Sequence, residues 1–474
     1  MRFFSKKKIL SLASVVFGAL LLSGCGFKSA PPETYQVKLE MWGIFDDSDA
    51  YTEVFNEYRR LNPYVGEIVY RKLPIETYKE DLLNALAAGK GPDIFMIRNA
   101  WRGAFEDKIA PAPDTMVTEK QYRDAFVDVV ASDFIGTENK IYGVPLSADS
   151  LALYYNKDLF NAAGIAEPPA TWEELLDDLH KLNRIDQFGN LTQSAAALGT
   201  AYNINRSTDI LTALLLQMGS GIGQAGQGRA DFTDRNSTRA LEFYTQFANI
   251  GSGFYSWNPR LHYSIDAFYE GTLGMMVNYS WQYATIKQKN AKLNFGVAPL
   301  PQFAGSAPVN VANYWGFAVA KNKATEDPAA SAGQTATVAA DPVKQNTLRV
   351  HEAWQLLSYL AFPHPRNTIT LVNGLAGTSK DFPLSFDPTK KYLDKTSKPA
   401  ARRDLIEAQK SDVRLAPFAA GNLIARNWYQ GNPEGVETIF AEAINAVNTG
   451  EKSAYDALMT AENRVNVLDR GAPR

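Results

Sequence analysis

The sequence predicts an α/β protein built from two lobes. Within the first hundred residues, segments with the apolar alternation of strands take turns with segments that have helical spacing. The chain has 474 residues and is 45% hydrophobic. Because a single hydrophobic core stops growing at about 250–300 residues, a chain of this length is expected to form two cores.

The first lobe is predicted to begin with a parallel sheet. The first helical pattern ends at Asn62-Pro63, and the second ends before Gly89. A β-α-β-α-β order implies parallel strands with right-handed crossovers. The predicted strands are 37–41, 67–72 and 93–97, and the helices between them are 51–61 and 78–86.

Further along the chain, helical and extended segments continue to alternate. Thr171 and Glu174 form a capping box, which opens a helix whose apolar face includes Trp172, a predicted core residue. Residues 324–348 are rich in Ala and Thr and predict an exposed, mobile insertion. The other predicted helices are 207–218, 236–250, 350–362, 399–410, 433–448 and 452–469, and the other strands include 273–277, 293–299 and 314–320.

The first 25 residues have the pattern of an export signal. Arg2 and three lysines precede an apolar run over 9–22. This run is shorter than a membrane span, which takes about 20 residues. The run ends in Leu22-Ser23-Gly24-Cys25, which resembles the bacterial lipobox, in which the cysteine is acylated. We therefore expect a lipoprotein signal peptide over 1–24, lipidation at Cys25, and a tether over 25–36 that holds the protein on the outer face of the bacterial cytoplasmic membrane. A buried free cysteine and a signal anchor are the alternatives.

Composition argues against several functions for the mature chain. Without residues 1–24 it has 44 basic and 51 acidic side chains, a net charge of −7, so we expect no nucleic-acid partner. Acylation of Cys25, the only cysteine, would leave no thiol for a disulfide, a metal site or a nucleophile. The four histidines are scattered without ligand spacing, so we expect neither a metal nor a cofactor.

Two short motifs favour structural interpretations. The run 221–226 fits a dinucleotide fingerprint by its letters, but it follows a helical segment instead of a strand, so we interpret it as a loop. The acidic run 46–49 lacks the downstream Gly and Glu of a calcium loop. It is expected to cap the helix that begins near Ser48, with one aspartate free to face a ligand.

The distribution of tryptophan predicts a ligand cleft. Ligands of open parallel sheets bind beyond the carboxyl ends of the strands, which here are the loops 42–47 and 98–101. Aromatic rings cover the apolar faces of sugar rings, and nearby carboxylates and amides bind the hydroxyl groups. Six tryptophans lie near element ends or in loops: Trp42, Trp101, Trp257, Trp281, Trp315 and Trp428. Trp172 and Trp354 lie in helical core patterns instead.

Several motifs together resemble the extracellular solute-binding proteins of ABC importers, in the branch of the maltose- and multiple-sugar-binding proteins. The most specific combination is a Tyr-Asn-Lys run, 155–157, followed by the Thr-Trp helix cap at 171–172. The resemblance covers nearly all of the mature chain. Its carriers are 88–95, 142–145, 153–160, 163–165, 169–175, 268–271, 274–276 and 296–301.

The resemblance implies a periplasmic-binding-protein-like fold of two α/β lobes with a hinge, and a ligand bound between the lobes. Lobe 1 is expected over 37–147 and 308–378, and lobe 2 over 148–307 and 379–474. The implied partners are a small-molecule solute, most simply a sugar, and the permease subunits of an ABC transporter, and a monomer is expected. The site residues expected from strand ends and from the resemblance are Trp42, Asp46, Asp47, Asn99, Trp101, Asp149, Trp281, Trp315 and Trp428.

Two departures from the family pattern and several alternatives remain. The loop after the third strand lacks the acidic-basic pair of maltose binders, and the insertion at 324–348 is longer than usual. A polyamine could be held by Asp46 and Asp149 with an aromatic cage, and a glycerol phosphate ester would need Arg98 or Arg102. A glycoside hydrolase using Asp46 and Asp149 is the enzymatic alternative, and a surface adhesin would have no small-molecule cleft.

Overall fold

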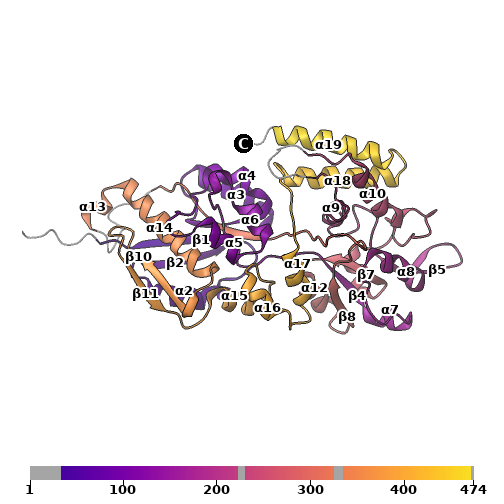
Figure 1. The fold of residues 1–474 in the computed structure, drawn as a ribbon, viewed down its shortest axis with the longest axis horizontal. Coiled ribbons are helices and arrows are strands. Elements are labelled where there is room, and N and C mark those ends of the chain that lie inside the picture. Colours follow the sequence, from indigo (N-terminus) through magenta and orange to yellow (C-terminus); the bar gives the residue numbers. More distant parts are fainter. Residues whose placement is uncertain (1–33, 223–229, 325–334, 471–474) are drawn as a thin grey trace, which may run out of the picture.

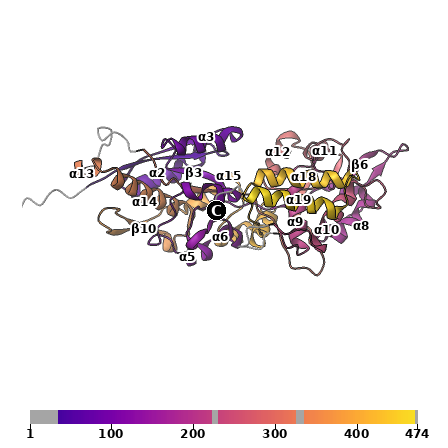
Figure 2. The ribbon, with the colours of Figure 1, turned by 90° about the horizontal axis from the view of Figure 1, so that it is seen from above.

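A computed structural model describes residues 34–222, 230–324 and 335–470, which form two lobes side by side along the long axis (Figures 1 and 2). Each lobe has its own hydrophobic core, so the predicted two-lobed α/β architecture is confirmed. The export signal, Cys25, most of the tether 25–36 and most of the run 221–226 lie outside the described residues.

Among the described residues, no helix is both long enough and apolar enough to span a membrane.

Lobe 1 is built on a four-stranded sheet of order β2-β1-β3-β9. The strands are β1 (Val37–Gly43), β2 (Val65–Lys72), β3 (Ile94–Arg98) and β9 (Trp315–Val319). β1 is parallel to both β2 and β3, as predicted, whereas β9 returns from the other lobe and pairs antiparallel to β3. The carboxyl ends of β1 and β3 and the start of β9 therefore meet at one edge of the sheet.

Helices cover this sheet and extend lobe 1. The two crossover helices are α2 (Thr52–Leu61) and α3 (Ile75–Ala87), and the long α14 (Pro342–Ala361) packs near β1 and β9. The remaining elements of lobe 1 are η1 (Ser48–Ala50), η2 (Asn99–Trp101), α4 (Arg102–Phe105), η3 (Glu106–Lys108), α5 (Glu119–Ala125), α6 (Asp128–Phe134), η4 (Thr137–Asn139), α13 (Ala336–Ala339), η7 (Pro365–Asn367), β10 (Thr368–Val372), β11 (Ser379–Pro383), α15 (Pro388–Thr396) and α16 (Arg403–Gln409).

Two predictions for lobe 1 are wrong. A lobe boundary at 378/379 would cut the β10–β11 hairpin, and Leu384, Tyr392 and Leu393 beyond it pack into the first core. The expected insertion over 324–348 is partly helical, because α14 begins at Pro342 and not near residue 350. Its start has a strong local signal, since the Asp341 side chain accepts hydrogen bonds from the backbone N–H groups of the first turn.

Lobe 2 is built on a five-stranded mixed sheet of order β5-β6-β7-β4-β8. The strands are β4 (Ala152–Asn156), β5 (Arg184–Ile185), β6 (Leu191–Ala196), β7 (Leu273–Asn278) and β8 (Phe295–Pro299). The helices are α7 (Lys157–Ala162), α8 (Trp172–Leu182), α9 (Ser207–Gln217), α10 (Arg235–Thr245), η5 (Gln246–Ala248), α11 (Ser264–Glu270), α12 (Gln282–Lys289), α17 (Ala416–Leu423), α18 (Pro433–Asn448) and α19 (Ala454–Arg470). α18 and α19 lie side by side near α9 and α10 (Figures 1 and 2).

Trp172 and Trp257 both lie in the core of lobe 2, although of the two the sequence predicted a core position only for Trp172. The capping box of Thr171 and Glu174 is confirmed, and Trp172 is fully buried, as predicted. Trp257, which was grouped with the cleft tryptophans, is also fully buried, and its Nε1 donates to Asn203 Oδ1 at 3.2 Å. The loop position of Trp257 in the sequence was therefore misleading, because this loop folds back onto the core.

The chain passes between the lobes three times, and the passes are hydrogen-bonded to one another. Isolated bridges join Ser150 to Ala312 and Asn310 to Ala425. The Asn310 side chain binds both backbone groups of Leu151, accepting from the N–H at 3.2 Å and donating to the carbonyl at 2.8 Å. The third pass includes α17, at the junction of the lobes (Figure 1).

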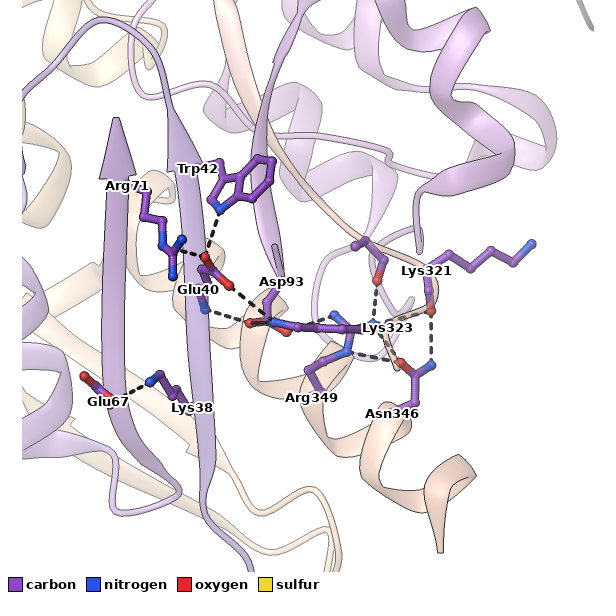
Figure 3. Close-up of polar contacts among 11 residues, drawn as sticks. Lys38, Glu40, Trp42, Glu67, Arg71, Asp93, Lys321, Lys323, Asn346 and Arg349 are labelled. Carbon is purple, nitrogen blue, oxygen red and sulfur yellow. Dashed lines mark hydrogen bonds and ion pairs between the residues drawn. The ribbon is translucent and has the colours of Figure 1, made fainter. Parts of the chain in front are cut away.

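A buried ionic cluster fixes the sheet of lobe 1 (Figure 3). Asp93, which is 1% exposed, accepts a hydrogen bond from the Glu40 N–H at 2.6 Å and one from Lys323 Nζ at 3.0 Å. Arg349 on α14 contacts Asp93 at 3.5 Å and donates to the Ala320 carbonyl at 2.6 Å. One carboxylate thus connects β1, the segment before β3, the segment after β9 and α14.

We predict that Asp93→Asn lowers the free energy of unfolding by about 3 kcal/mol, because it leaves the nearly buried Arg349 without a counter-charge and leaves Lys323 with only Glu40, at 3.8 Å. Urea unfolding followed by circular dichroism measures the loss. Glu67→Gln is the matched control: Glu67 pairs with Lys38 at 3.0 Å, both side chains are about half exposed, and the cost should stay below about 1 kcal/mol. Equal effects of the two substitutions would contradict this role of Asp93.

Candidate ligand-binding site between the lobes

A cavity lies between the lobes beside the crossing segments. Lobe 1 contributes Arg98 and Asn99 from the end of β3, and lobe 2 contributes Tyr279 from the end of β7. The first crossing back to lobe 1 lines it as well. The remaining lining residues are Ala100, Asp133, Thr208, Asp209, Thr212, Val311, Ala312, Asn313, Asn427, Trp428, Gln430, Pro433, Val436, Glu437 and Phe440.

Aromatic rings form the lobe 1 side of this junction. Trp315, at the start of β9, makes edge contacts with Phe45 at 5.6 Å and with Trp101 at 4.9 Å between ring centroids. Trp101 is buried, and its Nε1 donates to Glu434 Oε1 on α18 at 2.8 Å. Glu434 also pairs with Lys79 on α3 at 2.9 Å. Trp101 therefore joins the two lobes, and its N–H is not free for a ligand in this conformation.

A stacked aromatic pair forms the lobe 2 side. Trp281 follows β7 and stacks on Tyr279, with ring centroids 4.7 Å apart. The Tyr279 hydroxyl donates to Asp209 Oδ2 at 3.0 Å, which fixes the orientation of the inner ring. Trp281 is 39% exposed, unusually high for a tryptophan, and so presents apolar surface at the junction.

The two aspartates after β1 are bound to the protein. Both oxygens of the Asp46 carboxylate lie 2.7 Å from Lys398 Nζ, and the Tyr392 hydroxyl donates to it at 2.8 Å. Asp47 is exposed and pairs with Lys72 at 2.9 Å. The prediction that this run caps the next helix with a side chain is wrong, because Asp47 precedes η1 without a side-chain cap. Each of the three aspartates in this run forms an ion pair in this structure, Asp46 with Lys398, Asp47 with Lys72 and Asp49 with Lys395.

Asp149 joins the first crossing segment to the loop that holds Trp281. Its carboxylate accepts hydrogen bonds from Ser280 N–H at 3.0 Å, Ser280 Oγ at 2.6 Å and Ser150 N–H at 3.0 Å. Burial raises the pKa of Asp149 to about 7, although these hydrogen bonds and the charge of Lys398 act in the opposite direction. The residue therefore positions the aromatic pair and is not itself open to a ligand.

Asn99 belongs to a polar cluster around Asp133, a residue that the sequence analysis missed. The Asp133 carboxylate accepts from Asn99 Nδ2 at 2.9 Å, from the Tyr314 hydroxyl at 2.8 Å and from Asn427 Nδ2 at 2.8 Å. Burial raises the pKa of Asp133, while the three donors oppose that rise. Asp133 lies inside an ordinary amphipathic helix, so no local pattern marked it.

The other two predicted tryptophans have different surroundings. Trp42 donates from Nε1 to Glu40 at 3.0 Å within lobe 1 (Figure 3) and does not line the cavity. Trp428 lines the cavity, packs against Phe440 at 6.2 Å, and is 6% exposed. Its indole N–H has no hydrogen-bond partner among the described residues.

Four buried polar side-chain atoms of the described residues have no hydrogen-bond partner. Within the described part of the chain they are Arg206 Nε, Gln282 Oε1, Asn422 Oδ1 and Trp428 Nε1. Arg206 precedes α9, Gln282 follows Trp281, and Asn422 lies in α17. Buried polar groups in folded proteins normally have partners. Of these four residues, Trp428 lines the cavity. Arg206 had no sequence signal.

Among residues 34–222, 230–324 and 335–470, no group of three or more His, Cys, Asp and Glu side chains is arranged to hold a metal ion.

Comparison with known proteins identifies the class. The family model of the bacterial extracellular solute-binding proteins matches residues 45–361, and the chain belongs to this family. The structure of the cyclic α-maltosyl-1,6-maltose binding protein from Arthrobacter globiformis superposes with a TM-score of 0.67 at 20% identity, covering 92% of this chain and 100% of that one. The fold is therefore that of the two-lobed maltose-binding-protein-like receptors, as the resemblance implied.

Two sequence relatives differ in what their names say they bind. The sn-glycerol-3-phosphate-binding periplasmic protein UgpB of Salmonella typhimurium is 26% identical over 429 residues, 85% of this chain and 86% of its own length. The maltodextrin-binding protein MdxE of Bacillus subtilis is 23% identical over 312 residues, 62% of this chain and 68% of its own. Relatives of this family thus include receptors for neutral and for anionic solutes.

The raised pKa of Asp149 predicts a pH-dependent stability. The unfolded chain titrates near 3.8 and the folded one near 7, so the folded state holds this proton more tightly. The contribution of Asp149 to stability therefore falls as the pH rises from about 4 to 7, by at most about 4 kcal/mol. Urea unfolding at pH 5 and pH 8 should show that Asp149→Asn gains stability relative to wild type at the higher pH.

Asp81→Asn, at an exposed position on α3, is the control and should show no such gain. A stability difference between wild type and Asp149→Asn that is the same at both pH values would contradict the assignment.

Proposed function

We propose that this protein is a lipid-anchored extracytoplasmic receptor that binds a carbohydrate between its lobes and delivers it to an ABC importer. The observation that carries the proposal is the exposed ring of Trp281 beside the guanidinium of Arg206, whose buried Nε has no partner among the described residues. A second unpartnered donor, Trp428 Nε1, belongs to a residue that lines the cavity between the lobes. A sugar can bind to both features, because the apolar face of its ring stacks on an aromatic ring and its hydroxyl groups accept hydrogen bonds from the donors.

The arrangement of the cavity supports binding by closure. Its walls come from different lobes, and the lobes are connected by three crossing segments and have separate cores. A ligand that contacts both walls binds more tightly to the closed than to the open form and so shifts the population toward closure. The transporter then recognises the closed receptor.

The states of the acidic groups favour a receptor without catalysis. A glycoside hydrolase needs two carboxyl groups placed on either side of the scissile bond. Asp46 is held by Lys398, and Asp149 by Ser280, so neither carboxylate faces a free space. The same contacts count against a polyamine, which would need both aspartates as counter-charges.

An anionic solute is the second candidate. Arg102 is bound to Glu106 and to the Asp133 carbonyl and is therefore occupied. Arg98 lines the cavity and has no ion pair among the described residues. The match over 85% of this chain to a protein named as a glycerol-phosphate receptor gives this alternative a specific basis.

We predict that Trp281→Ala weakens binding of the sugar ligand by about 10–100-fold, because the stacking surface is lost, which corresponds to about 1.4–2.8 kcal/mol. Isothermal titration calorimetry with mono- and oligosaccharides measures the dissociation constant without relying on tryptophan fluorescence. Phe188→Ala removes an aromatic ring that is 79% exposed elsewhere on lobe 2 and should leave affinity unchanged. Binding of a polyamine or phosphate ester, with no response to any sugar, would overturn the carbohydrate proposal.

The lipid anchor is proposed from the sequence around Cys25. The described chain begins at residue 34, and Tyr35 is fixed to lobe 1 by a hydrogen bond from its hydroxyl to Glu352 on α14 at 2.5 Å. A short tether from Cys25 would therefore hold lobe 1 near the membrane and raise the effective concentration of the receptor at its transporter.

We predict that Cys25→Ala releases or mislocalises the protein and leaves its ligand affinity unchanged, since the residues that line the cavity lie within 98–440, far from Cys25 in the sequence. Membrane fractionation and calorimetry on the two forms measure the two effects separately. A folded Cys25→Ala protein that stays in the membrane fraction would count against the lipid anchor.

A further inference from the structure

Arg206 has an unusual combination of position, strain and missing partners. It precedes α9 with φ 65° and ψ 26°, a left-handed conformation that is costly for a residue other than glycine. No carboxylate of the described residues forms an ion pair with its guanidinium, and its buried Nε has no hydrogen-bond partner there. A partly buried cation is normally paired, so this one is available for a partner outside the chain.

The guanidinium lies beside the exposed aromatic platform. Its central carbon is 5.3 Å from the ring centroid of Trp281 and 5.9 Å from that of Tyr279, while the two rings are 4.7 Å apart. These three distances form a nearly equilateral triangle. The guanidinium therefore does not cover the face of Trp281 that points away from Tyr279, and a sugar ring can stack on that face with its substituents near Arg206.

The charges around the junction favour an anion at this position. Asp46, Asp133, Asp149 and Asp209 all accept hydrogen bonds or ion pairs from the protein. Asp133 and Asp209 line the cavity, and the third acid in its lining is Glu437, which is exposed. Arg98 and Arg206, one from each lobe, have no ion pair among the described residues. These acids all have partners within the protein, a lysine for Asp46 and neutral hydrogen-bond donors for Asp133, Asp149 and Asp209, whereas the two arginines have no ion pair in the described part of the chain.

We propose that Arg206 determines specificity and that the ligand carries an anionic oxygen group, a uronate carboxylate or a phosphate monoester, on a hydroxyl-rich body. The planar guanidinium binds two oxygens of such a group side by side, and Trp281 covers the adjoining ring. This inference rests on the proposed solute-receptor function and narrows its ligand class.

The test is a calorimetric panel of matched ligands on wild-type protein and variants. Digalacturonate and galactobiose form one pair, glucose 1-phosphate and glucose a second, and sn-glycerol 3-phosphate and glycerol a third. We expect one anionic member to bind at least tenfold more tightly than its neutral match, with an affinity that falls as NaCl concentration rises. The pair that responds distinguishes a carboxylate from a phosphate ester.

The variants separate charge recognition from general damage to the site. Arg206→Gln should lower affinity for the anionic ligand at least tenfold and change affinity for its neutral match less than threefold. Arg206→Lys should retain part of the preference. Arg260→Gln, which removes the same charge at an exposed position on lobe 2, should have no effect. Thermal melting of each variant establishes that it is folded.

Two results would overturn the inference in different ways. Neutral sugars that bind as tightly as their anionic matches, with Arg206→Gln affecting both equally, would remove the charge preference and leave the receptor function intact. Absence of binding by every member of the panel to folded wild-type protein would overturn the inference together with the proposed function.

Discussion

The constraint on which the rest of this structure depends is the triple passage of the chain between two separate cores. Each lobe buries its own apolar residues, so the junction needs little hydrophobic contact and is polar instead. Asn310 and Ser150 bind the passes to one another, through Leu151 and the Phe418 carbonyl respectively. Lobes connected in this way can rotate relative to each other without exposing either core to water.

Contacts that bridge the lobes away from the crossings are correspondingly weak. Glu434 accepts hydrogen bonds from both Lys79 and Trp101. Burial raises the pKa of Glu434, but the hydrogen bonds and the charge of Lys79 lower it by more, so the pKa lies below its usual value. The ion pair is partly exposed, and such pairs contribute about 0–1 kcal/mol. A contact of this size can bias the lobes toward one arrangement and still be broken by thermal motion, as a receptor that opens and closes requires.

The local elements of this fold were predictable, and its long-range pairings were not. The parallel sheet of lobe 1 and the helix at Trp172 follow from periodicity and caps, which act within a few residues. The third crossing was misplaced because β11 and Tyr392 return to the first core, a choice made by packing and not by pattern. The site shows the same division: Trp428 lines the cavity, but Trp42 and Trp257 do not, and the partners of Asp46 and Asp149 lie 352 and 131 residues away.

Asp149 also explains how the first crossing segment and the stacked pair of Tyr279 and Trp281 are connected. Asp149 lies at the start of a crossing, and Ser280, which donates two hydrogen bonds to it, sits between Tyr279 and Trp281. A rotation of the lobes about this crossing would therefore act on the hydrogen bonds between Asp149 and Ser280, which hold the stacked pair. Because the carboxylate is buried and has three donors, breaking them is costly, so the pair moves with the crossing. Trp281 and Arg206 then approach lobe 1 as one unit when the lobes close.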